Sequence, residues 1–260
     1  MPAKQLSIKP TQKELVMNIQ KSIILSGLLA SSSLFAGTSA INFTSTDLAD
    51  GPVVAGDLLA GDAIEINYNP ERLRVCTGSN RLVQSFRVLR YKLDGGEVQS
   101  KTLTSGPITI ATTADTKTLE YWFHNYSIGS FLCEAYDSNL GANYLVSLKP
   151  VVTFSTDIAE APVAGEINAG ESIVVKYPFA RFTKCTAANR STQSFRALYY
   201  SFDNGDVLSK PLSLADAEIT IDTPAEATSL QIWVGARSIG SQPCQAWDSN
   251  LGLNYNLELN

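Results

Sequence analysis

One nine-residue stretch occurs twice in the chain, as Tyr-Asp-Ser-Asn-Leu-Gly-Ala-Asn-Tyr at residues 136–144 and as Trp-Asp-Ser-Asn-Leu-Gly-Leu-Asn-Tyr at residues 247–255. We call these two stretches the signature loops. Asp and Asn side chains bond backbone groups nearby and Gly accepts positive φ, so each stretch predicts a tight polar turn. The aromatic residues at its ends are typical of strands. The duplication therefore predicts two β-rich repeats, each built around the same corner.

The sequence before each signature loop is duplicated as well. Apolar residues alternate with polar ones over residues 63–68 and again over residues 172–177, as in half-buried strands. Each copy also has a glycine-containing hairpin turn, at residues 94–96 and at residues 203–205. Each copy offers about seven short strands and no sustained helical period. We therefore expect an all-β chain of two tandem immunoglobulin-like antiparallel β-sandwiches, over residues 41–149 and 150–260.

The first 40 residues predict export. Lys21 precedes a short apolar run that ends near residue 36, and small residues follow as far as Ala40. This pattern is typical of a secretory signal peptide, and its apolar run is too short to span a membrane. We expect Met17 to be the true start, cleavage after Ala40, and a secreted or periplasmic protein without a membrane span.

The charge of the chain argues against polyanionic partners. Of the 20 basic and 25 acidic residues, four lysines and one glutamate lie in residues 1–40, so 16 and 24 remain and the net charge becomes −8. Such a surface repels phosphate backbones and anionic lipids. We therefore expect no nucleic-acid partner.

The four cysteines fall two to each repeat, and four cysteines permit three pairings. The duplication favours one disulfide inside each repeat, joining Cys76 to Cys133 and Cys185 to Cys244. In the chain-entropy model, closing loops of this length stabilises each repeat by about 4 kcal/mol. Oxidised cysteines agree with export.

Two tryptophans are expected on the outer faces of the sheets. Leu119, Tyr121 and Phe123 share one face of a strand, so Trp122 lies on the other face with His124. Trp233 has the same place in the second repeat, where glycine replaces the histidine. We interpret that difference as drift at a surface position. An outer-face tryptophan is either covered by a neighbouring segment or forms a platform for a ligand.

An arginine recurs four residues before the first cysteine of each repeat, as Arg72 and Arg181. The expected disulfide brings each arginine close to its signature loop. We therefore expect Arg72 to reach Asp137, and Arg181 to reach Asp248, or carbonyl groups of the same loops.

No catalytic motif is evident. The sequence has no Gly-x-Ser-x-Gly or His-Glu-x-x-His pattern, and its single histidine is not duplicated. We therefore expect a protein without enzymatic activity, cofactor or metal, a paired-carboxylate hydrolase being the one catalytic form left open. A calcium site is a weaker alternative, because the loops have alternating oxygen ligands but no bidentate acid. Its ligands would be Asp137, Asn139, Asn143, Asp248, Asn250 and Asn254.

The signature loop resembles the Trp-Asp-Asn-Asn-x-Gly-x-Asn-Tyr motif of the starch- and glycogen-binding modules of family 21, and residues 89–94 resemble that family's Val-Arg-Tyr-Thr-x-Asp strand and turn. The resemblance implies a non-enzymatic immunoglobulin-like sandwich in which loop asparagines contact glucan. It assigns that role to Asn143 and Asn254, with Ser138 and Ser249 in place of a further asparagine. The Arg-Leu pair before the first cysteine and Tyr-Asp-Ser-Asn after the second are closer to an uncharacterised bacterial family of exported domains.

These observations predict an exported, non-catalytic binding module with a glycan as its ligand. The alternative is a structural or protein-interaction module of the cell envelope, adhesin-like or inhibitor-like, with an envelope or extracellular protein as partner. The candidate ligand-binding residues are the aromatic and amide residues of the signature loops and the two outer-face tryptophans. They are Tyr136, Asn139, Asn143, Tyr144, Trp247, Asn250, Asn254, Tyr255, Trp122 and Trp233.

Overall fold

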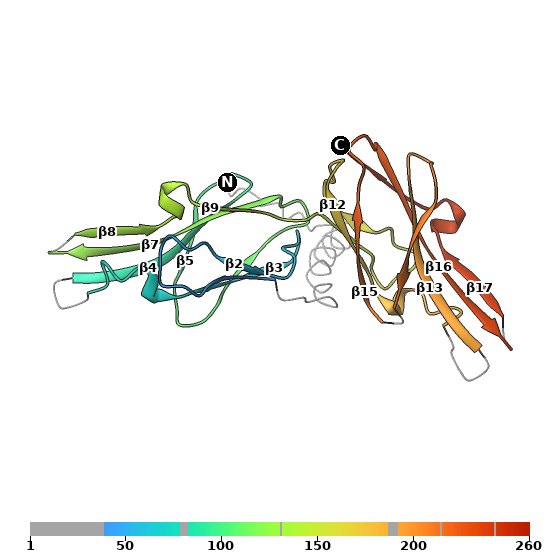
Figure 1. Cartoon of the computed structure of the whole chain (residues 1–260), viewed down its shortest axis with the longest axis horizontal. Coiled ribbons are helices and arrows are strands. Elements are labelled where there is room, and N and C mark those ends of the chain that lie inside the picture. The colour runs from blue at the N-terminus through green and yellow to red at the C-terminus, as the bar shows by residue number, and fades with distance from the viewer. Residues whose placement is uncertain (1–38, 79–82, 131, 187–191, 214, 242) are drawn as a thin grey trace, which may run out of the picture. The chain divides into compact units, whose positions relative to one another are not determined.

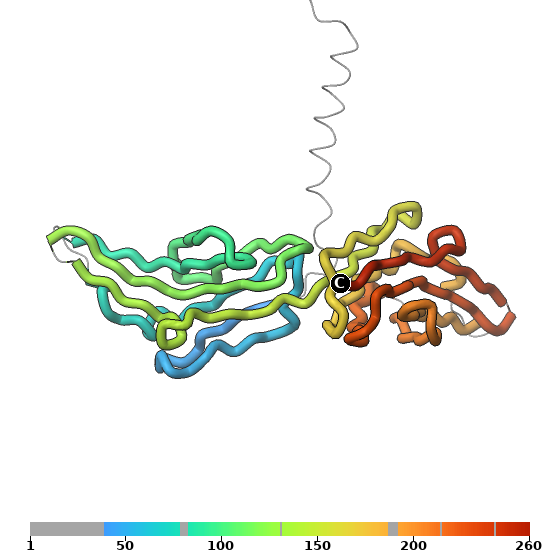
Figure 2. The backbone as a smooth tube through the Cα atoms, turned by 90° about the horizontal axis from the view of Figure 1, so that it is seen from above, coloured from blue at the N-terminus to red at the C-terminus, as the bar shows by residue number. Residues whose placement is uncertain are grey.

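The structure, a computed structural model, describes residues 39–260 except for residues 79–82, 131, 187–191, 214 and 242. The described chain consists of strands joined by loops and by short 3-10 turns (Figure 1). Figure 2 follows the backbone through the first repeat from blue to green and through the second repeat from yellow to red. Most of the predicted signal peptide lies outside the described residues, whereas Ala40 is already the first residue of a strand.

Nine strands form the first repeat, more than the seven expected, partly because the signature loop separates two short strands. They are β1 (Ala40–Phe43), β2 (Val53–Ala55), β3 (Ala63–Tyr68), β4 (Val83–Leu93), β5 (Gln99–Thr102), β6 (Ile108–Ala111), β7 (Thr118–Gly129), β8 (Cys133–Asp137) and β9 (Tyr144–Ser147). One sheet has the order β2-β1-β3-β6. The other has the order β5-β4-β7-β8, and β9 also pairs with β7.

The second repeat has the same two sheets. Its strands are β10 (Val151–Thr153), β11 (Val163–Ala164), β12 (Ser172–Tyr177), β13 (Thr192–Phe202), β14 (Leu208–Leu212), β15 (Ala217–Asp222), β16 (Ser229–Gly240), β17 (Cys244–Asp248) and β18 (Tyr255–Glu258). The sheets have the orders β11-β10-β12-β15 and β14-β13-β16-β17, with β18 also paired to β16. The all-β fold with two pairs of sheets therefore agrees with the sequence prediction.

One strand pair in each repeat is parallel, which the sequence analysis did not predict. β1 pairs with β3 in the same direction, and β10 pairs in the same way with β12. The reason is the short strand between them, since β2 runs antiparallel to β1. A chain that reverses a second time after β2 enters β3 in the direction of β1.

The core faces are those expected from the alternation of residues. Leu119, Tyr121 and Phe123 on β7 have no exposed surface, and Leu230, Ile232 and Val234 on β16 have none either. Because side chains alternate across a strand, the residues between them point away from the core. The outer face of each five-stranded sheet is therefore available for a site.

The hairpin turns also agree with the prediction. Asp94 and Gly95 have φ of 50° and 68°, and Asp203 and Asn204 have φ of 50° and 57°. Two successive positive values define the turn that joins strands with the natural twist.

Both predicted disulfides are present, which pairs all four cysteines of the chain. Cys76 is bonded to Cys133 and Cys185 to Cys244, with a Cα–Cα distance of 5.4 Å in each pair. Cys133 opens β8, and Cys76 follows the 3-10 turn η1 (Pro70–Arg72). The first disulfide therefore ties the loop that carries Arg72 to the strand that ends in the signature loop.

Candidate functional site

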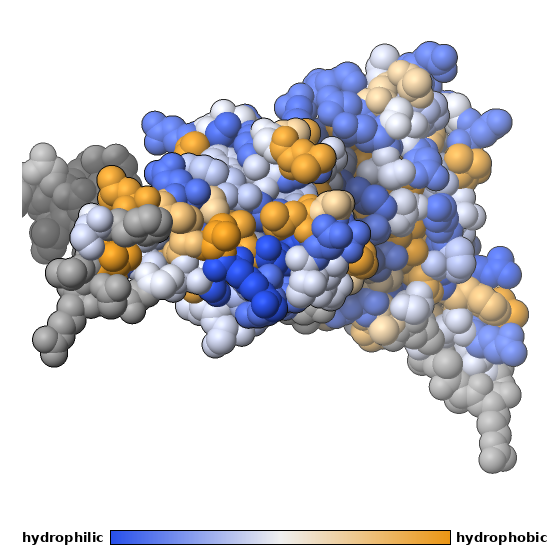
Figure 3. All heavy atoms as spheres, turned by 60° about the vertical axis from the view of Figure 1, so that its left-hand side comes forward, coloured by the Kyte–Doolittle hydropathy of each residue, from blue (hydrophilic) through white to orange (hydrophobic). Residues whose placement is uncertain are grey.

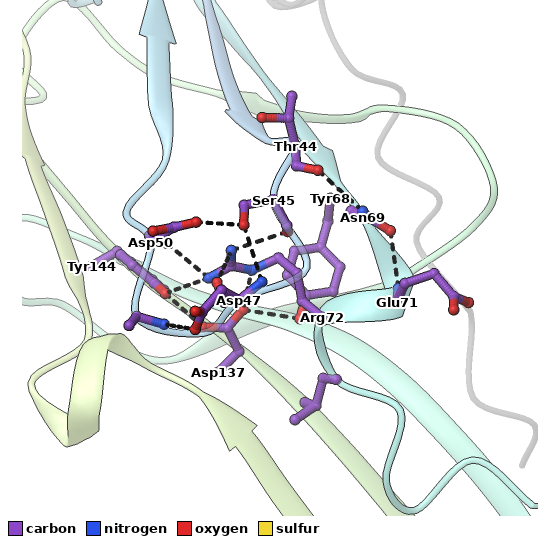
Figure 4. A network of polar contacts seen from close by, with 12 residues as sticks. Thr44, Ser45, Asp47, Asp50, Tyr68, Asn69, Glu71, Arg72, Asp137 and Tyr144 are labelled. Atoms are coloured by element: carbon purple, nitrogen blue, oxygen red, sulfur yellow. Dashed lines mark hydrogen bonds and ion pairs between the residues drawn. The ribbon is translucent and has the colours of Figure 1, made fainter.

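The aspartate of each signature loop is buried, and its carboxylate is hydrogen-bonded to side chains on the core side of the sheet. Arg72 Nε lies 2.9 Å from Asp137 Oδ2, and the hydroxyl groups of Tyr68 and Tyr144 donate to the same carboxylate at 3.0 and 2.5 Å. Figure 4 shows these side chains converging on one point. The carboxylate is fully paired without contact with solvent.

Arg72 also holds the loop between β1 and β2. Its two terminal nitrogens donate to the carbonyl oxygens of Ser45, Asp47 and Asp50 at 3.2, 2.6 and 3.0 Å (Figure 4). Orphan carbonyls in a loop need a donor when they are shielded from water. The arginine therefore connects three separate segments of the first repeat.

The second repeat reproduces this network. Arg181 Nε lies 2.7 Å from Asp248 Oδ2, and the hydroxyl groups of Tyr177 and Tyr255 donate to the same carboxylate at 2.6 and 2.5 Å. In both repeats the arginine and aspartate side chains are at most 1% exposed. The prediction that Arg72 and Arg181 reach the signature aspartates is therefore confirmed.

The two buried arginines stay protonated because each has an aspartate partner that offsets the cost of burial. Burial by itself lowers the pKa of Arg181, but the hydrogen bond and the charge of Asp248 outweigh it, so the pKa is raised overall. Burial, followed by the hydrogen bond to Asp137, raises the pKa of Tyr144 to about 12. The tyrosines thus remain donors to the carboxylates at neutral pH.

The bonding of the signature aspartates leaves no free carboxylate oxygen for the calcium alternative. Both oxygens of Asp137 and of Asp248 are occupied by arginine and tyrosine donors, and an adjacent guanidinium repels a cation. Within the part of the chain that the structure describes, no group of three histidine, cysteine, aspartate or glutamate side chains is placed to hold a metal ion.

Most of the signature loop is a structural corner. Tyr144 and Tyr255 are buried with their hydroxyl groups on the aspartates, so they face the core and do not face a ligand. Asn139, Asn143, Asn250 and Asn254 all have positive φ between 47° and 59°. Asparagine tolerates this conformation better than most residues. Their side-chain amides bond within the corner or to the neighbouring strand, as Asn143 does to Glu120 at 2.6 Å.

The residue that opens each signature loop does point outward. Tyr136 on β8 is 48% exposed and Trp247 on β17 is 46% exposed. Trp122 and Trp233 lie on the same outer faces, as predicted, and are half-buried. The Trp233 ring stacks on Tyr199, with 5.9 Å between ring centroids and 13° between ring planes. These four aromatic residues lie where a ligand can reach, and of the candidate asparagines Asn139 and Asn250 are exposed as well.

A hollow of about 290 Å³ lies on the outer face of the second repeat beside Trp247. Gly235 on β16 forms part of its lining, opposite Ala197 on β13 and Trp247 on β17. A Cβ atom at Gly235 would lie 2.5 Å from the Trp247 ring and 2.8 Å from the Tyr199 ring. The absence of a side chain at residue 235 therefore allows the two rings to lie where they do. The main side chains of the lining are those of Phe195, Tyr199, Arg237, Gln245 and Trp247.

His124 stands at the position in the first repeat that is equivalent to Gly235. Its ring lies between two tyrosine rings, stacked on Tyr136 with centroids 4.4 Å apart and on Tyr126 with centroids 4.9 Å apart. His124 is buried, and its Nδ1 accepts a hydrogen bond from Arg90 Nε at 3.1 Å. The difference between His124 and Gly235 is therefore not surface drift, because it decides whether an imidazole or the rings of Trp247 and Tyr199 cover this position of the strand.

Comparison with known families matches residues 48–260 to a model described as Family of unknown function (DUF6209). The chain belongs to this family. The family model spans both repeats, so the duplicated pair of sheets is itself the family's unit. The match agrees with the predicted resemblance to domains of unknown function. A search of curated proteins finds no match.

The outer face of this DUF6209 member carries a histidine in only one repeat, His124 on β7, and this predicts a pH effect. Burial, followed by the charge of Arg90, lowers the pKa of His124, while Glu134 opposes the shift. A depressed pKa in the folded state means that the unfolded chain takes up the proton first. The stability of the first repeat is therefore expected to be constant above a pH of about 6.5 and to fall as the pH drops below it.

Urea unfolding between pH 8 and pH 5 measures this effect. His124 is the only histidine of the chain, so a titration in this range that disappears in His124→Gln belongs to that residue. An identical pH dependence in the two proteins would refute the expectation.

Proposed function

We propose that this protein is an exported, non-catalytic binding module whose glycan site is the hollow on the outer face of the second repeat. The observation that carries the proposal is the exposed Trp247 ring, which packs over Gly235 at the edge of the hollow. Pyranose rings present apolar C–H faces, which pack well on aromatic faces. The volume of about 290 Å³ lies near the lower end of ligand pockets.

The polar groups beside the ring suit sugar hydroxyls. Gln245 is exposed next to the hollow, and its amide offers both a donor and an acceptor. Tyr199 and Phe195 supply further aromatic surface on the same face. A few polar groups among aromatic side chains are the usual composition of a small-molecule site.

The proposal of export without catalysis has separate support. Two disulfides persist in oxidising compartments outside the cytosol. Among the described residues, no helix is long and apolar enough to cross a membrane. The carboxylates of Asp137 and Asp248 are held in buried ion pairs, and the hollow itself is lined by no carboxylate that would act as a general acid or base.

A glycan array with the exported protein tests the proposal, with Trp247→Ala as the decisive variant. We expect the wild type to be retained on at least one glycan and the variant to lose that retention, because the stacking surface is removed. Tyr136→Ala is the matched control, since Tyr136 is the residue of the first repeat that is equivalent to Trp247. Both variants should melt within a few degrees of the wild type. Retention of Trp247→Ala at the wild-type level, or no retained glycan at all, would refute the site.

A protein-interaction role is the second candidate, and a different observation favours it. Leu140 and Leu251, at the tips of the signature loops, are almost fully exposed with φ of 57° and 58°. A leucine held in this conformation and in water is unusual for a surface without a partner. On the face shown in Figure 3, apolar residues gather in patches bordered by hydrophilic ones. Glycan retention that is kept in Leu251→Ser and lost in Trp247→Ala supports the glycan role over the protein-interaction role.

A further inference from the structure

The hollow on the second repeat carries positive charge in a strongly acidic chain. Its lining contains two arginines and neither aspartate nor glutamate. The whole chain has a net charge of −5, and −8 without its first 40 residues. A site for neutral sugars commonly pairs hydroxyl groups with carboxylates as well as amides, and the described lining offers no carboxylate.

Arg237 is the charge at the surface of the hollow. It is exposed on β16, where its cross-strand neighbours are Phe195 on β13 and Gln245 on β17. Its guanidinium carbon lies 5.9 Å from the centroid of the Phe195 ring. Among the described residues, no carboxylate forms an ion pair with Arg237. Its donors therefore face solvent and are available to a ligand.

Arg196, on the neighbouring strand β13, adds a second positive charge. It is buried on the inner face of β13, with its guanidinium carbon 5.4 Å from the Tyr177 ring and 5.0 Å from the Phe179 ring. Its Nε and Nη2 atoms have no hydrogen-bond partner in the described structure, and Asp216 is the carboxylate whose charge acts on it. An arginine stays protonated even when buried, so its field is only partly compensated.

Two of the lining positions carry a different charge in the first repeat. Tyr126 takes the place of Arg237, and Glu134 takes the place of Gln245. Glu134 accepts a hydrogen bond from the Tyr136 hydroxyl at 3.1 Å. The second repeat, which contains the hollow, therefore has an amide where the first repeat has a carboxylate. It also has a cation where the first repeat has a neutral ring.

We propose that the hollow binds the carboxylate of an acidic sugar, a uronic acid residue of a polysaccharide. The inference rests on the proposed glycan site and names the class of its ligand. The sugar ring stacks on Trp247, and its carboxylate accepts two parallel hydrogen bonds from the guanidinium of Arg237. The planar fork of arginine matches a planar carboxylate. Gln245 then bonds a neighbouring hydroxyl group.

Affinity electrophoresis of the full exported protein tests this inference with four probes: polygalacturonate, its fully methyl-esterified form, amylose and dextran sulfate. We expect polygalacturonate to retard the wild type and the esterified polymer, which lacks the charge on the same backbone, not to do so. Arg237→Gln should weaken the retardation about tenfold or more, the loss expected for a charge-assisted hydrogen bond. Arg237→Lys should keep part of it, and added salt should weaken it.

Each other outcome is decisive. Equal retardation by the esterified polymer, or an unchanged affinity of Arg237→Gln, overturns the uronate inference. Retardation by amylose alone that requires Trp247 also overturns it, while leaving the proposed glycan site intact. Equal retardation by dextran sulfate that does not require Trp247 shows general attraction of polyanions, and it too overturns the inference. If no probe retards the wild type and no glycan is retained on an array, both proposals fail. Arg74→Gln, an exposed arginine in the first repeat, is the charge-matched control.

Discussion

Replacing Arg181 with alanine is expected to lower the free energy of unfolding of the second repeat by about 3–5 kcal/mol, the range measured when one partner of a buried ion pair is removed. The substitution leaves the carboxylate of Asp248 buried without its cation. It also removes the donors to the carbonyl oxygens of Ser155, Asp157 and Glu160, which lie 3.1, 2.5 and 2.8 Å from the guanidinium. Lysine at this position should recover only part of the loss, because it lacks the fork that reaches several segments.

Urea unfolding followed by tryptophan fluorescence measures this loss. Two of the three tryptophans, Trp233 and Trp247, lie in the second repeat, so the signal reports mainly on that repeat. Arg74→Ala is the control, because Arg74 forms an exposed pair with Glu71 and such pairs contribute little. A midpoint for Arg181→Ala within error of the wild type would show that the network does not stabilise the repeat.

A double variant identifies the source of the loss. When both partners of a buried pair become apolar, no charge is left unpaired, and the cost is often small. Arg181→Met combined with Asp248→Leu should therefore unfold at higher urea concentration than Arg181→Ala alone. If the double variant is as unstable as the sum of the two single changes, the loss comes from the loop carbonyls and not from the orphaned carboxylate.

The duplication explains why these features were predictable from the sequence. A pair of residues that keeps its spacing in both copies has the same partners in both folds, and this held for the disulfides and for Arg72 with Asp137. Alternation over β7 and β16 fixed the core faces, because a strand has only two faces. One further signal was available, since Cys133, Ala135 and Asp137 alternate along β8 and thus share the inner face. That alternation argues against calcium at Asp137.

The open site was not predictable in the same way. The effect of a glycine at residue 235 depends on its cross-strand neighbours, Ala197 and Trp247, which are not adjacent to it in the sequence. A difference between the copies resembles drift until the register is known. The role of the signature asparagines is not predictable from the sequence for a related reason, because an amide that stabilises positive φ has the same sequence pattern as one that contacts a ligand.

Replacing Gly235 with histidine is expected to abolish binding at the second repeat by closing its hollow. The new Cβ atom alone would come within 2.5 Å of the Trp247 ring, and the imidazole would occupy the place that His124 fills in the first repeat. Retardation of the wild type on polygalacturonate should be lost to the same extent as in Trp247→Ala. Gly51→His is the matched control, since a side chain at Gly51 meets no atom within 4 Å.

Two further variants make this result specific to the hollow. If Gly235→His unfolds the second repeat, Gly235→Ala still forces the Trp247 and Tyr199 rings apart with a much smaller side chain, and a melting curve shows whether the fold survives. The reciprocal His124→Gly removes the ring that lies between Tyr126 and Tyr136, and it should destabilise the first repeat by the loss of both stacking contacts. It should not create uronate binding there, because Tyr126 and Glu134 stand where the second repeat has Arg237 and Gln245. Unchanged retardation of a folded Gly235→His protein would show that the ligand, if any, binds elsewhere than beside Trp247.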